Sequence, residues 1–169
     1  PTRLPEARKE KEITTTAELA KMSREAIHSK PGDIDAATRT FQELRIYVND
    51  ELGEIGKGLL AAEQLLKTGG TLAAISFHSL EDRLVKTFIT SRSQAPATSR
   101  HAPEVKVAPS SFKAVQRKAL VAGEEEVRMN PRSRSAKLRV AERTDAPAHY
   151  GDPLEALLAK VPSLDGEAR

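Results

Sequence analysis

The 169-residue chain contains neither cysteine nor tryptophan, and these absences limit its chemistry. Without cysteine it can form no disulfide, no thiolate zinc site and no cysteine nucleophile, which fits a reducing compartment. Four histidines are present, His28, His78, His101 and His149, and their wide separation gives no metal-ligand spacing. No metal site is therefore predicted. Aromatic residues make up 4% of the chain, so its core must be largely aliphatic.

Long hydrophobic runs are also missing. No apolar segment is long enough to span a bilayer and no signal peptide is recognisable, so we expect a cytoplasmic protein without a membrane partner. The net charge of +3 is a modest indication of an anionic partner. The chain begins with Pro1 rather than methionine, which predicts a fragment or a processed piece.

The most informative stretch is the apolar run Thr71–Phe77, which follows the pair Gly69-Gly70. A short apolar run between turn signals predicts a strand buried on both faces, as in a parallel sheet. The polar residues that follow begin a predicted helix, and ligands in open α/β sheets bind at this end of a strand. The residues placed there are Ser76, His78, Ser79, Glu81, Asp82 and Arg83. Helix capping with surface ion pairs is an equally good explanation of the pattern.

Other patterns predict the remaining elements. A capping box at Thr15–Glu18 predicts a helix over 16–27. Steps of three and four between apolar residues predict helix from Ala36 to Lys67, with Asn49-Asp50 or the glycines at 53, 56 and 58 able to divide it. Those glycines follow a helical pattern and are not a phosphate loop. Further along, the predictions are a loop over 90–111, strands over 112–120 and 136–142 that pair antiparallel, an acidic helical turn over 123–127, and a short helix over 154–160.

Two polar groups indicate contact with phosphates. The segment 128–139 carries five cations and no acid, and arginine forks and serine hydroxyls match phosphate oxygens. A solvated strand edge guarded by charge remains the alternative. Within the long helix, Thr38, Arg39, Gln42 and Arg45 share one face, for which the alternative is a solvated amphipathic helix.

Several motifs occur together in one order. They are Ile13-Thr-Thr-Thr, Ala37-Thr-Arg-Thr-Phe-Gln, Leu44-Arg-Ile-Tyr-Val-Asn-Asp-Glu-Leu, Ile75-Ser-Phe-His-Ser-Leu-Glu-Asp-Arg and Asn130-Pro-Arg-Ser-Arg-Ser-Ala-Lys-Leu-Arg. In order and wording they resemble the ribosomal small-subunit RNA cytosine-N4 methyltransferases, over roughly residues 10–143. The resemblance implies an α/β fold, a Rossmann-like S-adenosylmethionine-dependent methyltransferase sheet with an inserted helical substrate-recognition domain. It also implies methylation of the N4 amine of a cytidine in the decoding region of small-subunit (16S) ribosomal RNA.

The resemblance also implies a domain organisation. Residues 1–35 would end the inserted domain, 36–143 would be the C-terminal part of the methyltransferase domain, and 144–169 a flexible tail. Asp35-Ala36 replaces the family's His-Pro, so the helix there is expected to start differently. The family's Gly-rich loop lies in a first half that this chain lacks. We therefore assign no cofactor-binding residue, expect S-adenosylmethionine to be bound mainly by that half, and expect this chain alone to be inactive.

Roles follow from the reaction that is implied. A cytosine amine is a poor nucleophile, so the base must be extruded and an acceptor placed near the amine. The catalytic candidates are Ser76, His78, Glu81 and Asp82, with His78 first. The RNA-binding candidates are Arg39, Thr40, Arg45, Asn130, Arg132, Arg134 and Lys137. The alternative is a non-catalytic RNA-binding or assembly fragment that docks on ribosomal RNA or a partner chain through an exposed sheet edge, and a homodimer stays open.

Overall fold

The computed structural model describes residues 12–27, 32, 35–93, 109–149 and 154–159. They form two compact units, residues 1–51 and 52–169. Residues 1–11, most of the loop predicted over 90–111 and much of the tail predicted over 144–169 lie outside the described residues. Within the described residues, no helix is both long and apolar enough to cross a membrane.

The first unit holds the helices α2 (Thr16–Ala26) and α3 (Ala36–Val48), which pack on each other. The predicted capping box begins α2, where the hydroxyl of Thr15 accepts from the N–H of Glu18. Asp35 caps α3 by accepting from the N–H of Ala37 at 3.0 Å. The same carboxylate accepts three hydrogen bonds from Arg24, two from Nε and one from Nη2, the shortest at 2.8 Å, and so joins the two helices. Asp35 thus caps α3, and the helix begins at Ala36, as predicted.

The long periodic stretch is divided, as predicted, at Asn49-Asp50. Asp50 has φ 49°, a left-handed conformation that no helix interior tolerates, and α4 (Glu51–Leu65) starts after it. The glycines at 53, 56 and 58 stay inside α4. Of the apolar residues whose spacing predicts this helix, Phe41 is half-buried, whereas Leu44 is 43% and Val48 77% exposed. The buried Ile46 lies outside that spacing.

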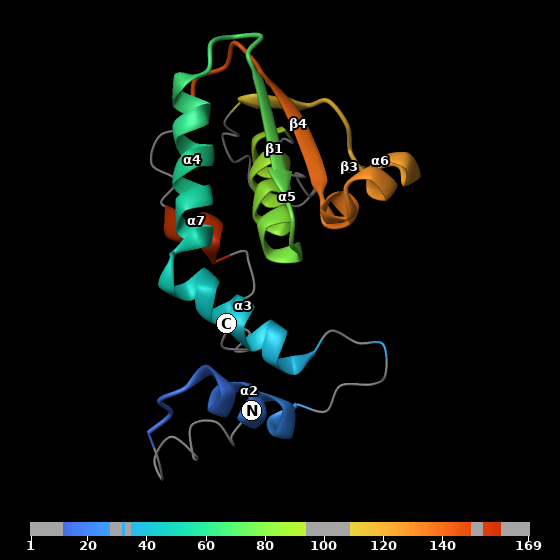
Figure 1. Cartoon of the computed structure of the whole chain (residues 1–169). Helices are drawn as coiled ribbons and strands as arrows, with labels where there is room; N and C mark the ends of the chain where they lie inside the picture. Colours follow the sequence, from blue (N-terminus) through green and yellow to red (C-terminus); the bar gives the residue numbers. More distant parts are fainter. Residues whose placement is uncertain (1–11, 28–31, 33–34, 94–108, 150–153, 160–169) are drawn as a thin grey trace, which may run out of the picture. The chain divides into compact units, whose positions relative to one another are not determined.

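The second unit is built on a small antiparallel sheet (Figure 1). Its strands are β1 (Thr71–Ser76), β2 (Phe112–Ala114), β3 (Leu120–Val121) and β4 (Lys137–Arg143). β4 lies in the middle, between β1 on one side and β2 with β3 on the other. The helix α5 (Ser79–Ser93) packs against β1, β2 and β4. The remaining helices are α6 (Glu124–Met129), the 3-10 helix η1 (Pro131–Ser135) and α7 (Leu154–Leu158).

The prediction that β1 is buried on both faces, as in a parallel sheet, is wrong for the described part of the chain. β1 pairs antiparallel with β4, and no parallel neighbour occurs among the described residues. Its residues alternate, so that Leu72 and Ala74 pack on the core while Ile75 is 63% exposed, and Phe77 just beyond it is 56% exposed. An apolar run predicts that a strand will be covered on both faces but does not say what covers it.

The turn that leads into β1 requires both of its glycines. Gly69 has φ +80°, which a residue with a Cβ rarely adopts, and a Cβ on Gly70 would lie 2.8 Å from the carbonyl oxygen of Lys67. The close approach lets Gly69 donate to the carbonyl of Arg143 and Arg143 donate to that of Gly70, both at 2.8 Å. The turn thereby fixes the register of β1 on β4.

The strand predicted over 112–120 is interrupted. Ala114 pairs with Ala141 and Leu120 with Leu138, so five residues, 115–119, stand where β4 has only two, 139 and 140. The extra residues form a wide bulge on this edge of β4. The strand predicted over 136–142 is confirmed within one residue, and α5 continues to Ser93, four residues into the predicted loop.

The core of the second unit is mainly aliphatic, as predicted, around one aromatic pair. Phe88 of α5 and Phe112 of β2 meet edge to face, with their ring centroids 5.8 Å apart. The other buried members are Leu59, Leu84, Val85, Ile89, Ala141 and Leu157. Because Leu157 belongs to α7, part of the chain after Thr144 packs on the core.

A charged carboxylate lies beside this core. Glu63 of α4 is 1% exposed and accepts from Nε of Arg92 at 2.9 Å, from the hydroxyl of Ser111, and from the N–H of His149 at 3.1 Å. Arg143 donates to the carbonyl of Glu63 at 2.9 Å. Burial alone would raise the pKa of Glu63, but these hydrogen bonds and the Arg92 charge hold it below its ordinary value. One carboxylate thus binds three separate segments to α4.

We predict that Glu63→Gln lowers the free energy of unfolding by about 3–5 kcal/mol at neutral pH, because it removes one charge of a buried ion pair with Arg92. Urea unfolding of the chain measures this change. Glu54→Gln is the matched control, since Glu54 is exposed and forms a surface ion pair with Lys57, and it should change stability by less than about 0.5 kcal/mol. Equal effects of the two substitutions would contradict a structural role for Glu63.

The difference between the native chain and Glu63→Gln should depend on pH. The pKa of Glu63 is lower in the folded than in the unfolded chain, so its stabilising effect is complete above the ordinary pKa of 4.5 and is lost as the pH falls through the folded value. Unfolding curves measured from neutral pH into the acid range should therefore converge for the two proteins.

Candidate functional site

The antiparallel register brings the predicted catalytic and basic residues to one end of the sheet. Ser76, the last residue of β1, pairs with Lys137, the first residue of β4. The turn from β1 into α5 therefore lies beside the segment that enters β4, which includes η1 (Figure 1). We call this end of the sheet the candidate site.

Glu81 organises the turn after β1. Its Oε2 accepts from the N–H of Phe77 at 2.8 Å and from the N–H of His78 at 3.2 Å. Free N–H groups at the start of a helix are commonly satisfied by such an acid three residues on. Glu81 therefore acts here as the cap of α5, the alternative that the sequence left open.

His78 lies over the same carboxylate. Its Nδ1 accepts from the N–H of Glu81 at 3.4 Å, which leaves the ring proton of the neutral form on Nε2. Nε2 is 3.2 Å from Oε1 of Glu81, within ion-pair range, but the atoms are not aligned for a hydrogen bond. Nε2 is one of two buried side-chain atoms among the described residues that have no hydrogen-bond partner. A substrate atom could supply that partner.

Asp82 and Ser76 are engaged with β4. Asp82 accepts from Nε of Arg139 at 2.7 Å and from Nζ of Lys137 at 3.3 Å. Burial alone would raise the pKa of Asp82, but these two cations hold it below its ordinary value. The hydroxyl of Ser76 donates to the carbonyl of Lys137 at 3.4 Å. Both side chains link the turn to β4, so His78 has the most freedom to meet a substrate.

The predicted basic segment contains paired and exposed cations. Arg128 forms two hydrogen bonds with Glu125, the shorter at 2.6 Å. Arg132 and Arg134 lie on η1, exposed, with no ion pair to another described residue. The side chain of Asn130 accepts from the N–H of Arg132 at 3.3 Å and so caps η1. Its amide therefore shapes the helix that presents the two free arginines.

The other RNA-binding candidates belong to α3 in the first unit. Arg39 is exposed, and the hydroxyl of Thr40 donates to the carbonyl of Ala36 at 3.1 Å. Arg45 forms two hydrogen bonds with Glu51, the shorter at 2.8 Å. On this helix Arg39 is thus the candidate most available to a phosphate.

The residues at this end of the sheet do not fit S-adenosylmethionine by themselves. Recognition of its ribose uses a free acid at a strand end, together with a Gly-rich turn. Among the described residues of the site, Glu81 is committed to two backbone N–H groups and Asp82 to two cations. No step through this cofactor is derived from these side chains.

Two features of the site could not be predicted by the motifs. Arg139 was recognised only as part of a basic run, yet it is the main partner of Asp82, 57 residues away in sequence. The bulge at 115–119 carries Arg117 and Lys118, which no motif includes. The available signal was the absence of any acid between residues 109 and 123.

Comparisons with known proteins agree with the motifs. The sequence profile described as the MraW methylase family matches residues 2–144. Similar proteins named ribosomal RNA small subunit methyltransferase H occur in Rhodopseudomonas palustris strain TIE-1 (57% identical over 148 residues, 88% of this chain and 45% of the relative) and in Bradyrhizobium diazoefficiens (57% over 145 residues, 86% and 44%). The protein of that name in Xanthobacter autotrophicus is 50% identical over 164 residues, 96% of this chain and 48% of the relative. The chain spans about half the length of these relatives.

We predict that Asp82→Asn lowers the free energy of unfolding by about 1.5–3 kcal/mol at neutral pH, since it weakens charge-assisted hydrogen bonds to Arg139 and Lys137. Because the pKa of Asp82 is lowered in the folded chain, the loss should shrink as the pH falls below its ordinary value of 3.8. Urea unfolding at several pH values measures both effects. Asp145→Asn, at an exposed position, is the control. A loss for Asp82→Asn no larger than that of the control would show that the contacts of Asp82 with Arg139 and Lys137 do not stabilise the fold.

Proposed function

Because the chain belongs to the MraW methylase family, we propose that it is the C-terminal part of an S-adenosylmethionine-dependent methyltransferase that acts on small-subunit ribosomal RNA. The observation that carries the proposal is the family match over residues 2–144. The candidate site supports it, since a buried histidine nitrogen without a hydrogen-bond partner lies at the same end of the sheet as two exposed arginines.

We propose further that the target is the N4 amine of a cytidine in the decoding region. The lone pair of that amine is shared with the ring, so an acceptor beside it would strengthen its attack. His78 is proposed to hold or deprotonate the amine through Nε2, with Glu81 as the carboxylate that stabilises the ring when it is charged. To accept the proton on Nε2, the neutral ring must first carry its own proton on Nδ1 and give up the 3.4 Å hydrogen bond from the N–H of Glu81. Ser76 and Asp82 would keep the turn on β4. The cytidine would have to leave its stack to reach the turn.

The RNA would be held by cations of both units. Arg132 and Arg134 on η1 are proposed as the main phosphate contacts, with Asn130 shaping their helix and Lys137 adding charge at its end. Arg39, Thr40 and Arg45 of α3 would contribute from the first unit, proposed to be the end of an inserted substrate-recognition domain. A ribosomal RNA substrate also places the enzyme in the cytoplasm.

The cofactor would be bound mainly outside this chain. The described side chains at the site leave no acid for its ribose, and the relatives are about twice as long. β1 has one strand neighbour among the described residues, so its second edge would accept further strands of a Rossmann-like sheet. On this proposal the chain alone has no methyltransferase activity.

A second candidate function is RNA binding or assembly without catalysis. The same lack of a cofactor site favours it, as does the open edge of β1, which could pair with a partner chain or with a second copy. Calorimetry of this chain with S-adenosylmethionine does not separate the two, because neither expects this chain to hold the cofactor. A protein of the relatives' length should bind the cofactor under either proposal, whereas methyl transfer to ribosomal RNA is expected only from an enzyme.

We predict that His78→Ala, in a protein of the relatives' length that includes this chain, lowers kcat at least 100-fold while the Kd for RNA changes less than about 3-fold. Loss of a proton acceptor affects the transition state more than binding of the substrate. Single-turnover methylation and fluorescence anisotropy measure the two quantities. An equal loss of rate and of affinity would show that His78 only shapes the turn.

We predict that Arg134→Ala weakens RNA binding by this chain and reduces the slope of log K against log salt by about 1, because one phosphate contact is lost. Arg128→Ala is the matched control on the neighbouring helix, since Glu125 already neutralises Arg128. Anisotropy titrations at several salt concentrations compare the two. A salt slope unchanged from that of the native chain would remove Arg134 from the RNA interface.

A further inference from the structure

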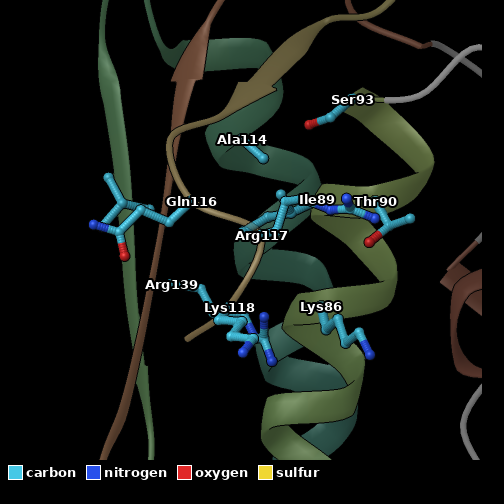
Figure 2. Close-up of a pocket in the computed structure, with 10 residues that line it drawn as sticks. Lys86, Ile89, Thr90, Ser93, Ala114, Gln116, Arg117, Lys118 and Arg139 are labelled. Atoms are coloured by element: carbon cyan, nitrogen blue, oxygen red, sulfur yellow. The ribbon is translucent and has the colours of Figure 1, made fainter. Parts of the chain in front are cut away.

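A cleft of about 490 Å³ lies between α5 and the bulge at 115–119. Its lining residues come from α5, from the end of β2, from the bulge and from β4: Lys86, Ile89, Thr90, Ser93, Ala114, Gln116, Arg117, Lys118, Arg139 and Val140. Figure 2 shows Arg117, Lys118 and Arg139 extending from the sheet side toward α5, with Lys86 on the helix across from them. Its volume falls within the range of about 300–1,000 Å³ that is common for ligand sites.

The shape of the cleft follows from the strand register. Five residues, 115–119, bridge a gap that two residues of β4 would span, so the bulge stands away from the sheet edge. Gln116, Arg117 and Lys118 lie at this displaced point and line the opening. The bulge therefore presents adjacent cations to a hollow, which a regular strand would have turned to opposite faces.

The cleft is strongly positive. Four cations line it. Among the described residues, the acid that forms an ion pair with one of them is Asp82, which binds Arg139 at 2.7 Å. Lys86, Arg117 and Lys118 form no ion pair with another described residue and are exposed at its rim. After Asp82, the rest of α5 contains no acid, and neither does the segment 109–123. Charges of one sign facing a shared hollow repel each other and favour an anion there.

A second observation points into the same cleft. The hydroxyl of Ser93 is buried and has no hydrogen-bond partner among the described residues, although Ser93 lines the cleft. In Figure 2 this hydroxyl points away from α5 toward the side of Ala114. Buried polar groups are nearly always hydrogen-bonded, so an unpartnered hydroxyl at the edge of a positive hollow indicates a missing acceptor.

We propose that this cleft binds the sugar-phosphate backbone of the substrate RNA. Arg117, Lys118 and Lys86 would contact the phosphate, and the Ser93 hydroxyl would donate to a ribose or phosphate oxygen. The apolar side chains of Ile89 and Val140 suit ribose carbons, and no aromatic residue lines the cleft to stack on a base. The inference rests on the proposed function, since it identifies a second contact for the same RNA.

The position of the cleft supports RNA rather than an isolated anion. Arg139 belongs to the cleft and, through Asp82, to the turn that carries His78, so the cleft and the candidate site share one ion pair. A strand of RNA held in the cleft would approach that turn. Its backbone contacts carry no sequence information and would position the RNA rather than select the base.

The test compares two variants in which each substitution replaces one cation by glutamine. Arg117→Gln combined with Lys118→Gln removes cations from the cleft, whereas Lys113→Gln removes one from the same edge segment outside it. The probe is a fluorescein-labelled fragment of small-subunit ribosomal RNA, titrated into the full chain at several salt concentrations. We expect the double variant to raise the Kd about 10-fold and to lower the salt slope by about 1 to 2, with little change for Lys113→Gln.

Ser93→Ala gives an independent readout. Removal of a buried hydroxyl without a partner should leave thermal stability unchanged or higher, while the affinity for the RNA probe falls. A drop in stability together with unchanged affinity would mean that the hydroxyl is structural, and would count against its assignment to the ligand.

The outcomes are distinct. If the double variant binds RNA with the same affinity and salt slope as Lys113→Gln, the cleft proposal is overturned. This holds even if Arg134→Ala weakens binding and so supports the proposed function. A second result would also overturn it: the double variant keeps the RNA affinity of the native chain but loses a saturable binding of inorganic phosphate that the native chain shows. The cleft would then be a small-anion site. No salt-dependent binding of RNA by the native chain would overturn both proposals.

Discussion

The second unit depends on one buried negative charge. The carboxylate of Glu63 is held by Arg92 of α5, by Ser111 before β2 and by the backbone of His149, while Arg143 of β4 binds the Glu63 carbonyl. A buried ion could not remain charged without such partners, and each partner comes from a different segment. The sheet, its covering helix and the segment after β4 are therefore positioned by the same few atoms.

A second ion pair of the same kind positions the candidate site. Asp82 fastens the start of α5 to Arg139 and Lys137 of β4, so the turn that carries His78 is fixed relative to η1. Among the described residues, the two buried side-chain atoms without hydrogen-bond partners are Nε2 of His78, just before α5, and the hydroxyl of Ser93, at the end of α5. The core satisfies its polar groups, and the exceptions occur where a substrate would be met.

Local signals predicted most of the elements, and long-range contacts account for what they missed. The capping box, the break at Asn49-Asp50, and the strands β1 and β4 follow from neighbouring residues. The antiparallel pairing of β1 depends on residues about sixty positions away, and an apolar run gives no direction to its neighbour. The bulge was missed because alternation over 112–120 does not reveal how many residues oppose β4. Glu81 and His78 could be predicted as site residues from their side-chain type, whereas the ion pair of Asp82 with Arg139 can be recognised only in the structure.

The order of strands has a consequence for synthesis on the ribosome. β4 comes last in sequence but lies in the middle, and among the described residues β1 and β2 each pair with it alone. Ser76 and Lys137 are 61 positions apart, and at about 5–20 residues per second this length of chain takes roughly 3 to 12 seconds to make. During that interval the apolar strand has no partner from this part of the chain, so the nascent protein is exposed to misassociation until its central strand emerges.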